Sequence, residues 1–496
     1  MLKRITAALI SLMLLLCGCN SDVSIPATVG ESIVKGKPKA GGEISLYSFQ
    51  QDTFNPLLTN IKANYDVLGL IFEPVVRNNP DGTIEGVLAT SWTRSADGKK
   101  YTFDICDKAV FHDGEPLTPQ DVATSIVMAA TPQSPFYNGL RIVDKVFCND
   151  DKVVVSLVEP VTSFPSLLEI PVMRAAHTKL TDGYLPVGTG PYVYDGSSES
   201  KTFDLVANEK WWQGKSYISK IKVKVLPDKA SVTYAYDSGS IDAFATDVIS
   251  AGKYAGDGLS RVKYFADTTL IIMGFNNLSI PFATAEARKS VASAIDKDKV
   301  NEEKILSNYI VTHTPINPQK KNYCDDVTVY SPAYKYDMQT QVMPFEILVC
   351  SSNSISCDIG EAIVKQLTDR GFVTTLVPVS DEEYHARIGQ RQYDAFIGGF
   401  SLLPNDDLNS LLGGGNYFNY ESDDIKAYLS VLPATDGGKL IESYNGLQHV
   451  YSSDLPFISL FYEQKALVVR NTVGGEILPL AENVYYNINN WFTETK

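Results

Sequence analysis

The side chains best suited to chemistry are scattered along this chain. The histidines are His112, His177, His313, His385 and His449, and no two of them have the spacing that places metal ligands on one helix face. The run Asp381-Glu382-Glu383-Tyr384-His385 is typical of a solvated helix start. The chain contains no Gly-x-Ser-x-Gly, His-Glu-x-x-His, P-loop or EF-hand pattern. We therefore predict no enzyme activity, no metal site and no cofactor.

Five cysteines follow the first nineteen residues, namely Cys106, Cys148, Cys324, Cys350 and Cys357. Cys106 and Cys148 are expected on neighbouring strands. Cys350 should end a strand and Cys357 should start the next helix. Each of these pairs could form a disulfide in an oxidising compartment, and buried thiols are the alternative for both.

Two features of the whole chain exclude other function classes. It has 496 residues, of which 44% are hydrophobic and 20% charged, so it is long enough for two to three globular domains. Its net charge is −15, and it becomes −17 without Lys3 and Arg4. Such an acidic chain has no electrostatic reason to bind nucleic acid or anionic lipid head groups.

The amino-terminal residues have the pattern of a secretion signal. Residues 1–18 combine Lys3 and Arg4 with an apolar run that is too short to span a bilayer. The run ends in Leu16-Cys17-Gly18-Cys19, which resembles a bacterial lipobox with cleavage before Cys19 and lipid on its sulfur. Residues 19–40 hold few large apolar side chains and are predicted to be a tether.

The stretch from Leu88 to Ile126 carries the strongest local signals. It reads LATSWTRSADGKKYTFDICDKAVFHDGEPLTPQDVATSI, with a turn at Ser95–Gly98 and alternating apolar residues from Tyr101 to Ile105. Thr118-Pro119-Gln120-Asp121 is typical of a capped helix start. These residues predict strands, turns and a helix that form a scaffold.

This string resembles the family-5 extracytoplasmic solute-binding proteins of ABC importers, with Cys106 and Ala109 as departures from the family pattern. Further matches are Phe54-Asn55-Pro56-Leu57, Val187-Gly188-Thr189-Gly190-Pro191-Tyr192 and the helix that ends in Ala294-Ile295-Asp296-Lys297. In the second of these, no third glycine follows and Pro191 blocks a helix start, so a tight structural turn is favoured over a phosphate loop.

The resemblance implies an α/β fold with the two lobes of a type II (class C) periplasmic binding protein and a small additional α+β subdomain. Strands and helices alternate from Phe345 to Phe400, which indicates a parallel sheet covered by helices. The crossover strands between the lobes are expected near Leu270–Asn276 and Phe457–Val469. The predicted division is lobe I at 41–60, 183–268 and 473–496, the small subdomain of lobe I at 61–182, and lobe II at 269–472.

From the same resemblance we expect a lipid-anchored, monomeric solute-binding component of an ABC importer, held outside the cytoplasmic membrane by Cys19. It would capture a peptide or peptide-like compound between hinged lobes and deliver it to permease subunits. A ligand receptor or sensor is the alternative, as is binding of a sugar or metal chelate. Solute should lie beyond the carboxyl ends of strands. That rule gives the candidate ligand-binding residues Phe49, Gln50, Phe54, Asn55, Phe275, Asn276, Phe400, Ser401, Leu402, Leu403, Asn416 and Tyr417.

One departure bears on the ligand. In peptide-binding members, the strand corresponding to Tyr393–Phe400 leads to an Asp that pairs with the peptide α-ammonium, and here that position holds Leu403. An ammonium buried without a carboxylate is costly. Either Asp406 or Asp407 replaces the missing carboxylate, or the ligand has no free amine there. The spacing favours a ligand without the amine.

Overall fold

The computed structural model describes residues 28–29, 38–177, 185–196, 199–306, 308–333 and 343–493. The predicted signal peptide and Cys19 lie outside these residues. Within them, no helix is both long enough and apolar enough to cross a membrane. Thr28–Val29, inside the segment predicted as a tether, forms β1 and pairs with β13.

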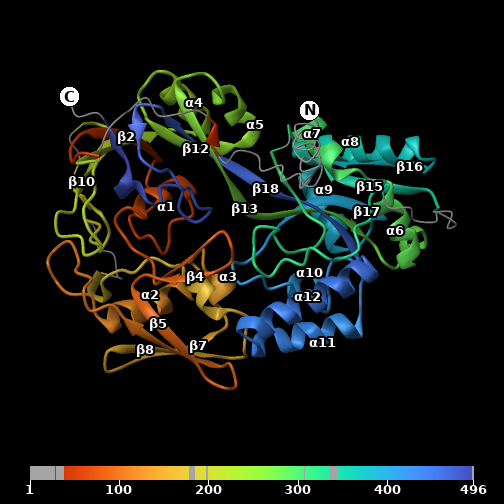
Figure 1. Ribbon diagram of the computed structural model, residues 1–496, viewed down its shortest axis with the longest axis horizontal. Helices are drawn as coiled ribbons and strands as arrows, with labels where there is room; N and C mark the ends of the chain where they lie inside the picture. The colour runs from red at the N-terminus through yellow and green to blue at the C-terminus, as the bar shows by residue number, and fades with distance from the viewer. Residues whose placement is uncertain are drawn as a thin grey trace, which may run out of the picture.

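Two long antiparallel strands connect the halves of the molecule. β13 (Ser260–Phe275) and β18 (Phe457–Arg470) lie side by side and run diagonally across it, as Figure 1 shows. Their pairing is interrupted between Ala266 and Leu270. Both predicted crossovers are therefore confirmed, although each strand is longer than expected. The break falls beside the predicted lobe boundary at 268/269, and the division into lobes stays a prediction.

The larger sheet has the strand order β12-β18-β13-β17-β15-β16, in which β12 is Ala243–Asp247. β14 (Ile310–Val311) pairs with β18. β15 (Phe345–Cys350) is parallel to both β16 (Thr374–Val379) and β17 (Ala395–Ser401). The helices between them are α8 (Ser354–Asp369) and α9 (Asp381–Gly389). This unit confirms the predicted alternation, and α8 begins four residues earlier than expected because Asn353 caps it.

The remaining helices of this half surround the same sheet (Figure 1). Their bounds are α6 Ala285–Ser293, α7 Lys297–Ile305, α10 Asn409–Leu412, α11 Asp423–Val431 and α12 Gly437–Asp454.

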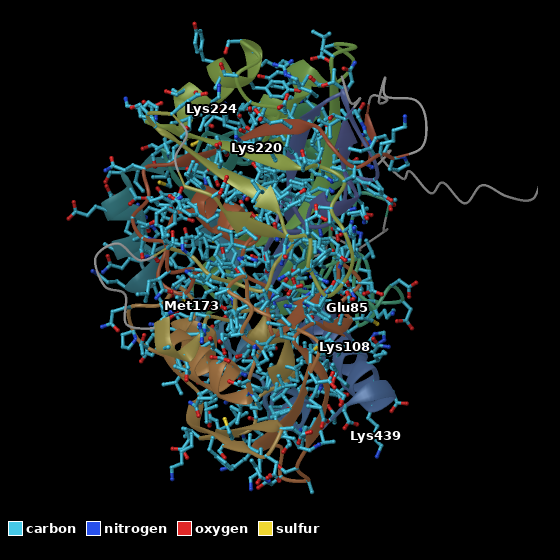
Figure 2. The ribbon with its side chains drawn as sticks, turned by 90° about the vertical axis from the view of Figure 1, so that its left-hand side faces the viewer. Glu85, Lys108, Met173, Lys220, Lys224 and Lys439 are labelled. Atoms are coloured by element: carbon cyan, nitrogen blue, oxygen red, sulfur yellow. The ribbon has the colours of Figure 1, made fainter. Side chains whose placement is uncertain are left out.

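A second sheet, with the order β2-β11-β10-β9, forms much of the other half. Its strands are β2 Glu43–Phe49, β9 Tyr192–Tyr194, β10 Thr202–Ala207 and β11 Lys220–Leu226. In Figure 2, Lys220 and Lys224 mark this sheet, and Met173 and Glu85 mark the subdomain below it. β12 (Ala243–Asp247), α4 (Lys229–Asp237) and α5 (Val248–Ala251) connect the sheet to the crossover strands. Trp491 is fully buried in the core that this half shares with the subdomain.

The small subdomain is a four-stranded sheet, β5-β6-β8-β7, covered by α2. Its strands are β5 Ala89–Arg94, β6 Lys100–Ile105, β7 Val143–Asn149 and β8 Lys152–Leu157, with the hairpin β3 Val76–Asn78 and β4 Ile84–Gly86 beside them. Its helices are α2 Pro119–Ala129 and α3 Tyr137–Leu140, preceded in the chain by α1 Lys62–Leu68. Thr118 is the N-cap of α2, as predicted, and it forms a capping box with Asp121.

His112 connects the two strongest sequence motifs. Its Nε2 lies 3.0 Å from the carbonyl oxygen of Gly190, and its Nδ1 accepts from the backbone N–H of Gly188. Burial lowers the pKa of the imidazole. A Cβ at Gly188 would lie 2.0 Å from the carbonyl oxygen of Ile71, so this turn requires glycine for close packing. The structural interpretation of the Gly-x-Gly turn is confirmed.

All five described cysteines are free thiols, so neither candidate disulfide forms. The expectation that Cys106 and Cys148 lie on neighbouring strands is wrong, because β8 separates β6 from β7. Cys357 instead donates its thiol to the backbone carbonyl of Cys350 at 3.4 Å.

Candidate functional site

A cavity of about 450 Å³ lies between the subdomain and the carboxyl end of β17. α1, α3 and the turn at Ser166–Glu169 line one side, and Ser401–Pro404 line the other. A second cavity of about 220 Å³ shares Leu402–Pro404 and Glu482 with the first, and continues along β13 at Tyr264–Thr268. Together they form one cleft that crosses the interrupted part of the crossover strands.

The far wall of the cleft is the segment that follows β17. β17 is parallel to β15, so both strands end at the same edge of the sheet, and the segment after β17 reaches the subdomain. Leu403 packs against the subdomain core, and the side-chain amide of Asn405 donates to the carbonyl oxygen of Thr162 at 3.1 Å. The two sides of the cleft therefore touch directly beside the cavity.

The near wall carries two acidic residues. Glu169 is 9% exposed, and its Oε2 accepts from both the backbone and side-chain N–H groups of Asn78, each at 2.9 Å. Burial and then repulsion from Glu482 raise the pKa of Glu169 to about 8. Burial also raises the pKa of the half-buried Glu482. Among the described residues, no donor is hydrogen-bonded to the Glu482 carboxylate. The pair can therefore accept hydrogen bonds from a bound solute.

The two carboxylates considered as substitutes at the Leu403 position are already engaged. Asp406 forms an ion pair with Lys320 and accepts from the side-chain amide of Asn322 at 3.2 Å. Asp407 accepts from the backbone N–H of Asn409 at 2.9 Å and from the side-chain amide of the same residue.

Of the predicted ligand-binding residues, Ser401, Leu402 and Leu403 line the cleft. Phe49 and Gln50 lie beside α1, where the Asn64 side chain bonds the backbone of both.

Four other predicted positions do not line either cavity of the cleft. Phe54 packs edge-on against Tyr194 and Phe203, and buried Asn55 accepts from the backbone N–H of Leu57. Phe400 and Tyr417 contact each other, with ring centres 5.8 Å apart.

Phe275, Asn276 and Asn416, also predicted as ligand-binding residues, do not line either cavity of the cleft. β13 runs antiparallel to β17, so the carboxyl end of β13 lies at the amino end of β17, where Phe275 pairs with Ala395. Phe275 is fully buried. The Asn276 side chain donates to the carbonyl oxygens of Arg391 and Tyr393, and Asn416 closes its own loop.

Most residues of the near wall were not predicted from the sequence. Its members come from separate turns of the subdomain and from the carboxyl-terminal segment: Lys62, Tyr65, Phe136, Leu167, Glu169 and Glu482. None of them belongs to a recognisable motif. The only local signal was the short helix that carries Lys62 and Tyr65, which follows the Asn55-Pro56-Leu57 turn.

Comparison with known proteins identifies the family. Residues 83–420 match the family model for bacterial extracellular solute-binding proteins, family 5. The chain belongs to this family. The oligopeptide-binding protein AppA of Bacillus subtilis is 21% identical over 98% of this chain and 97% of its own. A probable D,D-dipeptide-binding periplasmic protein of Escherichia coli, DdpA, is 23% identical over 98% of this chain and 99% of its own.

Solved structures show the same fold. HbpA2 from Haemophilus parasuis superposes with a TM-score of 0.79 at 18% identity, covering 92% of this chain and 100% of that one. The AppA complex with a nonapeptide gives a TM-score of 0.62 at 19% identity, with the same coverage of both chains. The family-5 protein described here therefore has the two-lobed binding-protein fold and is a solute-binding component of the kind that serves ABC transporters.

Proposed function

We propose that this family-5 protein is anchored outside the cytoplasmic membrane and carries a peptide or peptide-like solute to the permease of an ABC importer. Capture involves no chemical step, and the protein acts as a monomer. The observation that supports this most is the cleft itself, which combines apolar walls with an acidic pair whose hydrogen-bonding capacity is not fully used by the protein.

Solute binding is coupled to closure of the two sides of the cleft. The crossover strands lose their pairing between Ala266 and Leu270, which gives the chain a place to bend. Across the cleft, Lys321 pairs with Asp81 at 2.8 Å, and Asn405 bonds Thr162. Apart from the packing of Leu403, these contacts are polar, and we infer that bound solute shifts the balance between formed and broken contacts.

The cleft also indicates what the solute presents. Phe136, Leu167 and Leu403 offer apolar contact, while Glu482 offers a carboxylate in place of the aspartate missing at position 403. We therefore infer a solute with an apolar part and at least one hydrogen-bond donor directed at Glu482. A sugar or a metal chelate is the alternative class of ligand, and a sensor is the alternative role.

Mass spectrometry of solute retained through gentle purification would identify the ligand class directly. Calorimetry with unmodified and N-acetylated di- to pentapeptides would then test the acidic pair. We expect Glu482→Gln to weaken binding of the preferred solute about tenfold, as loss of a charge-assisted hydrogen bond does. Glu302→Gln, at an exposed position of α7, is the matched control. Unchanged affinity in Glu482→Gln would contradict the proposed contact.

Two further measurements test the remaining parts of the proposal. Small-angle scattering should give a smaller radius of gyration with saturating solute than without it, and an equal radius would contradict closure. Cys19→Ala should release the protein from membranes. A processed variant that remains on the membrane would show that the anchor is elsewhere.

A further inference from the structure

Three potential metal ligands meet on the surface away from the cleft. The Sγ of Cys324 lies 2.9 Å from Oδ1 of Asp326 and 3.7 Å from Nε2 of His449. The same Nε2 lies 3.2 Å from Oδ1 of Asp326. All three ligand atoms lie within 4.8 Å of one another. A thiol, a carboxylate and an imidazole are thus gathered around one point.

These separations suit a tetrahedral ion. Zinc bond lengths of about 2.3 Å to sulfur and about 2.0–2.1 Å to nitrogen or oxygen give ligand–ligand distances of about 3.3–3.6 Å. The sulfur–nitrogen and nitrogen–oxygen distances here are 3.7 and 3.2 Å. The sulfur–oxygen distance of 2.9 Å departs most from this range, because the protonated thiol donates to the carboxylate. Placing an ion among them requires only small side-chain movements.

Gln448, the residue before His449, fixes the backbone at Cys324 through hydrogen bonds. Gln448 is fully buried in α12, and its Oε1 accepts from the backbone N–H of Cys324 at 3.1 Å. Its Nε2 donates to the carbonyl oxygen of Asn322 at 2.8 Å. Consecutive residues of one helix therefore fix the loop and supply the imidazole. This is the kind of supporting hydrogen bonding that orients metal ligands.

One of the three ligands is buried and the other two are exposed to solvent. Cys324 is 3% exposed, whereas the His449 and Asp326 side chains are 49% and 76% exposed. An ion can therefore enter from solvent and keep a fourth position for water. This arrangement was not predictable from the sequence, because Cys324 and His449 are 125 residues apart.

We propose that Cys324, Asp326 and His449 bind one divalent ion of zinc-like preference, with water as the fourth ligand. One thiolate, one imidazole and one carboxylate form a donor set that zinc accepts. On binding, the Cys324 thiol releases its proton to solvent and its sulfur bonds the metal. The site is separate from the cleft and does not depend on the solute that the protein carries.

Tag-free reduced protein titrated with Co²⁺ and then with Zn²⁺ tests the proposal. We expect one Co²⁺ per chain, a near-ultraviolet absorption band from thiolate-to-cobalt charge transfer, and loss of that band when Zn²⁺ displaces cobalt. Cys324→Ser should abolish the band. His449→Gln and Asp326→Asn should weaken binding at least about tenfold. His449→Gln changes an exposed side chain, so it keeps the test valid if Cys324→Ser folds poorly.

Two matched controls separate this site from incidental binding. His385→Gln removes an exposed histidine that also lies beside an aspartate, Asp381, at 3.5 Å. Cys148→Ser removes a half-buried thiol that contacts Gln120. Both variants should bind metal as the unmodified protein does. Absence of the band in the unmodified protein, or equal affinity in His449→Gln, would overturn the proposal.

Discussion

A cavity lies at each end of β17, and the two differ in how fully the protein itself uses the hydrogen-bonding groups of their polar side chains. At its carboxyl end, the cleft beside Ser401–Pro404 is lined by Glu482 and Glu169, whose carboxylates are raised in pKa and not saturated by protein donors. At its amino end lies a larger hollow of about 630 Å³. There Arg288 donates to three backbone carbonyl oxygens, and Asn416 bonds the backbone of its own loop. Size alone would select the amino end.

What distinguishes the ends is where the polar side chains direct their hydrogen bonds. A buried amide or guanidinium whose groups are used by the backbone stabilises the fold and has little left for a solute. A carboxylate that is costly to bury and incompletely paired is stabilised when a solute supplies donors. On this basis we propose that solute binds at the carboxyl end of β17 and that the polar residues at its amino end stabilise the fold.

The largest effect should come from the supporting end. Asn416→Ala removes donors to Gly413 and Tyr420 and acceptors for the backbone N–H groups of Phe418 and Tyr420. Leaving these buried groups unpaired should lower the free energy of unfolding by about 4 kcal/mol. Urea denaturation measures this, with exposed Asn409→Ala as the control. A loss equal to that of the control would contradict the supporting role.

A smaller effect is expected at the binding end from Leu403→Asp. The measured quantity is the ratio of the affinity for a peptide with a free amino terminus to the affinity for its N-acetylated form. The new carboxylate should make this ratio about tenfold larger than in the unmodified protein. Leu403→Asn is the isosteric control without charge. Calorimetry with both peptides gives the ratio. If the two variants share one ratio, the residue does not face the solute's amino terminus.

The pH dependence of stability should report on Glu169. Its folded pKa of about 8 exceeds the ordinary value of 4.5, so the folded state keeps a proton that the unfolded state has released. Stability from this group is present below about pH 4.5 and is lost as the pH rises through about 8. Urea denaturation at several pH values should show a flatter profile for Glu169→Gln than for the unmodified protein. Identical profiles would mean that Glu169 titrates normally.

The smallest effect belongs to the ion pair that crosses the cleft. Lys321→Met removes the ion pair with Asp81. The side chains are 62% exposed for Lys321 and 43% exposed for Asp81, so we expect the free energy of unfolding to change by about 0.5 kcal/mol or less. The radius of gyration without solute should nevertheless increase, since the pair joins the two sides. Lys365→Met, which removes a pair within α8, should leave the radius unchanged.

The fold was largely predictable from the sequence, because its signals are local. The capped start of α2 and the alternation from Phe345 to Phe400 depend on residues close together in the chain. The cleft was not predictable from the sequence, because Glu169 and Glu482 come together only in the folded chain. Phe275 was misplaced for a related reason. The rule that solute lies at strand carboxyl ends needs strand direction, and the antiparallel pairing of β13 with β17 was not evident from the sequence.

The crossover strands have a consequence for how the molecule melts. β18 pairs with β12 on one side of the interruption and β13 pairs with β17 on the other, so one hydrogen-bonded sheet extends through both halves. If the strands of one half unfold, hydrogen bonds of strands that also belong to the other half are broken. Chain continuity alone would permit two calorimetric transitions, whereas a shared sheet couples them into one cooperative unit. The strand pair at which we propose that the protein bends is thus also what makes its halves unfold together.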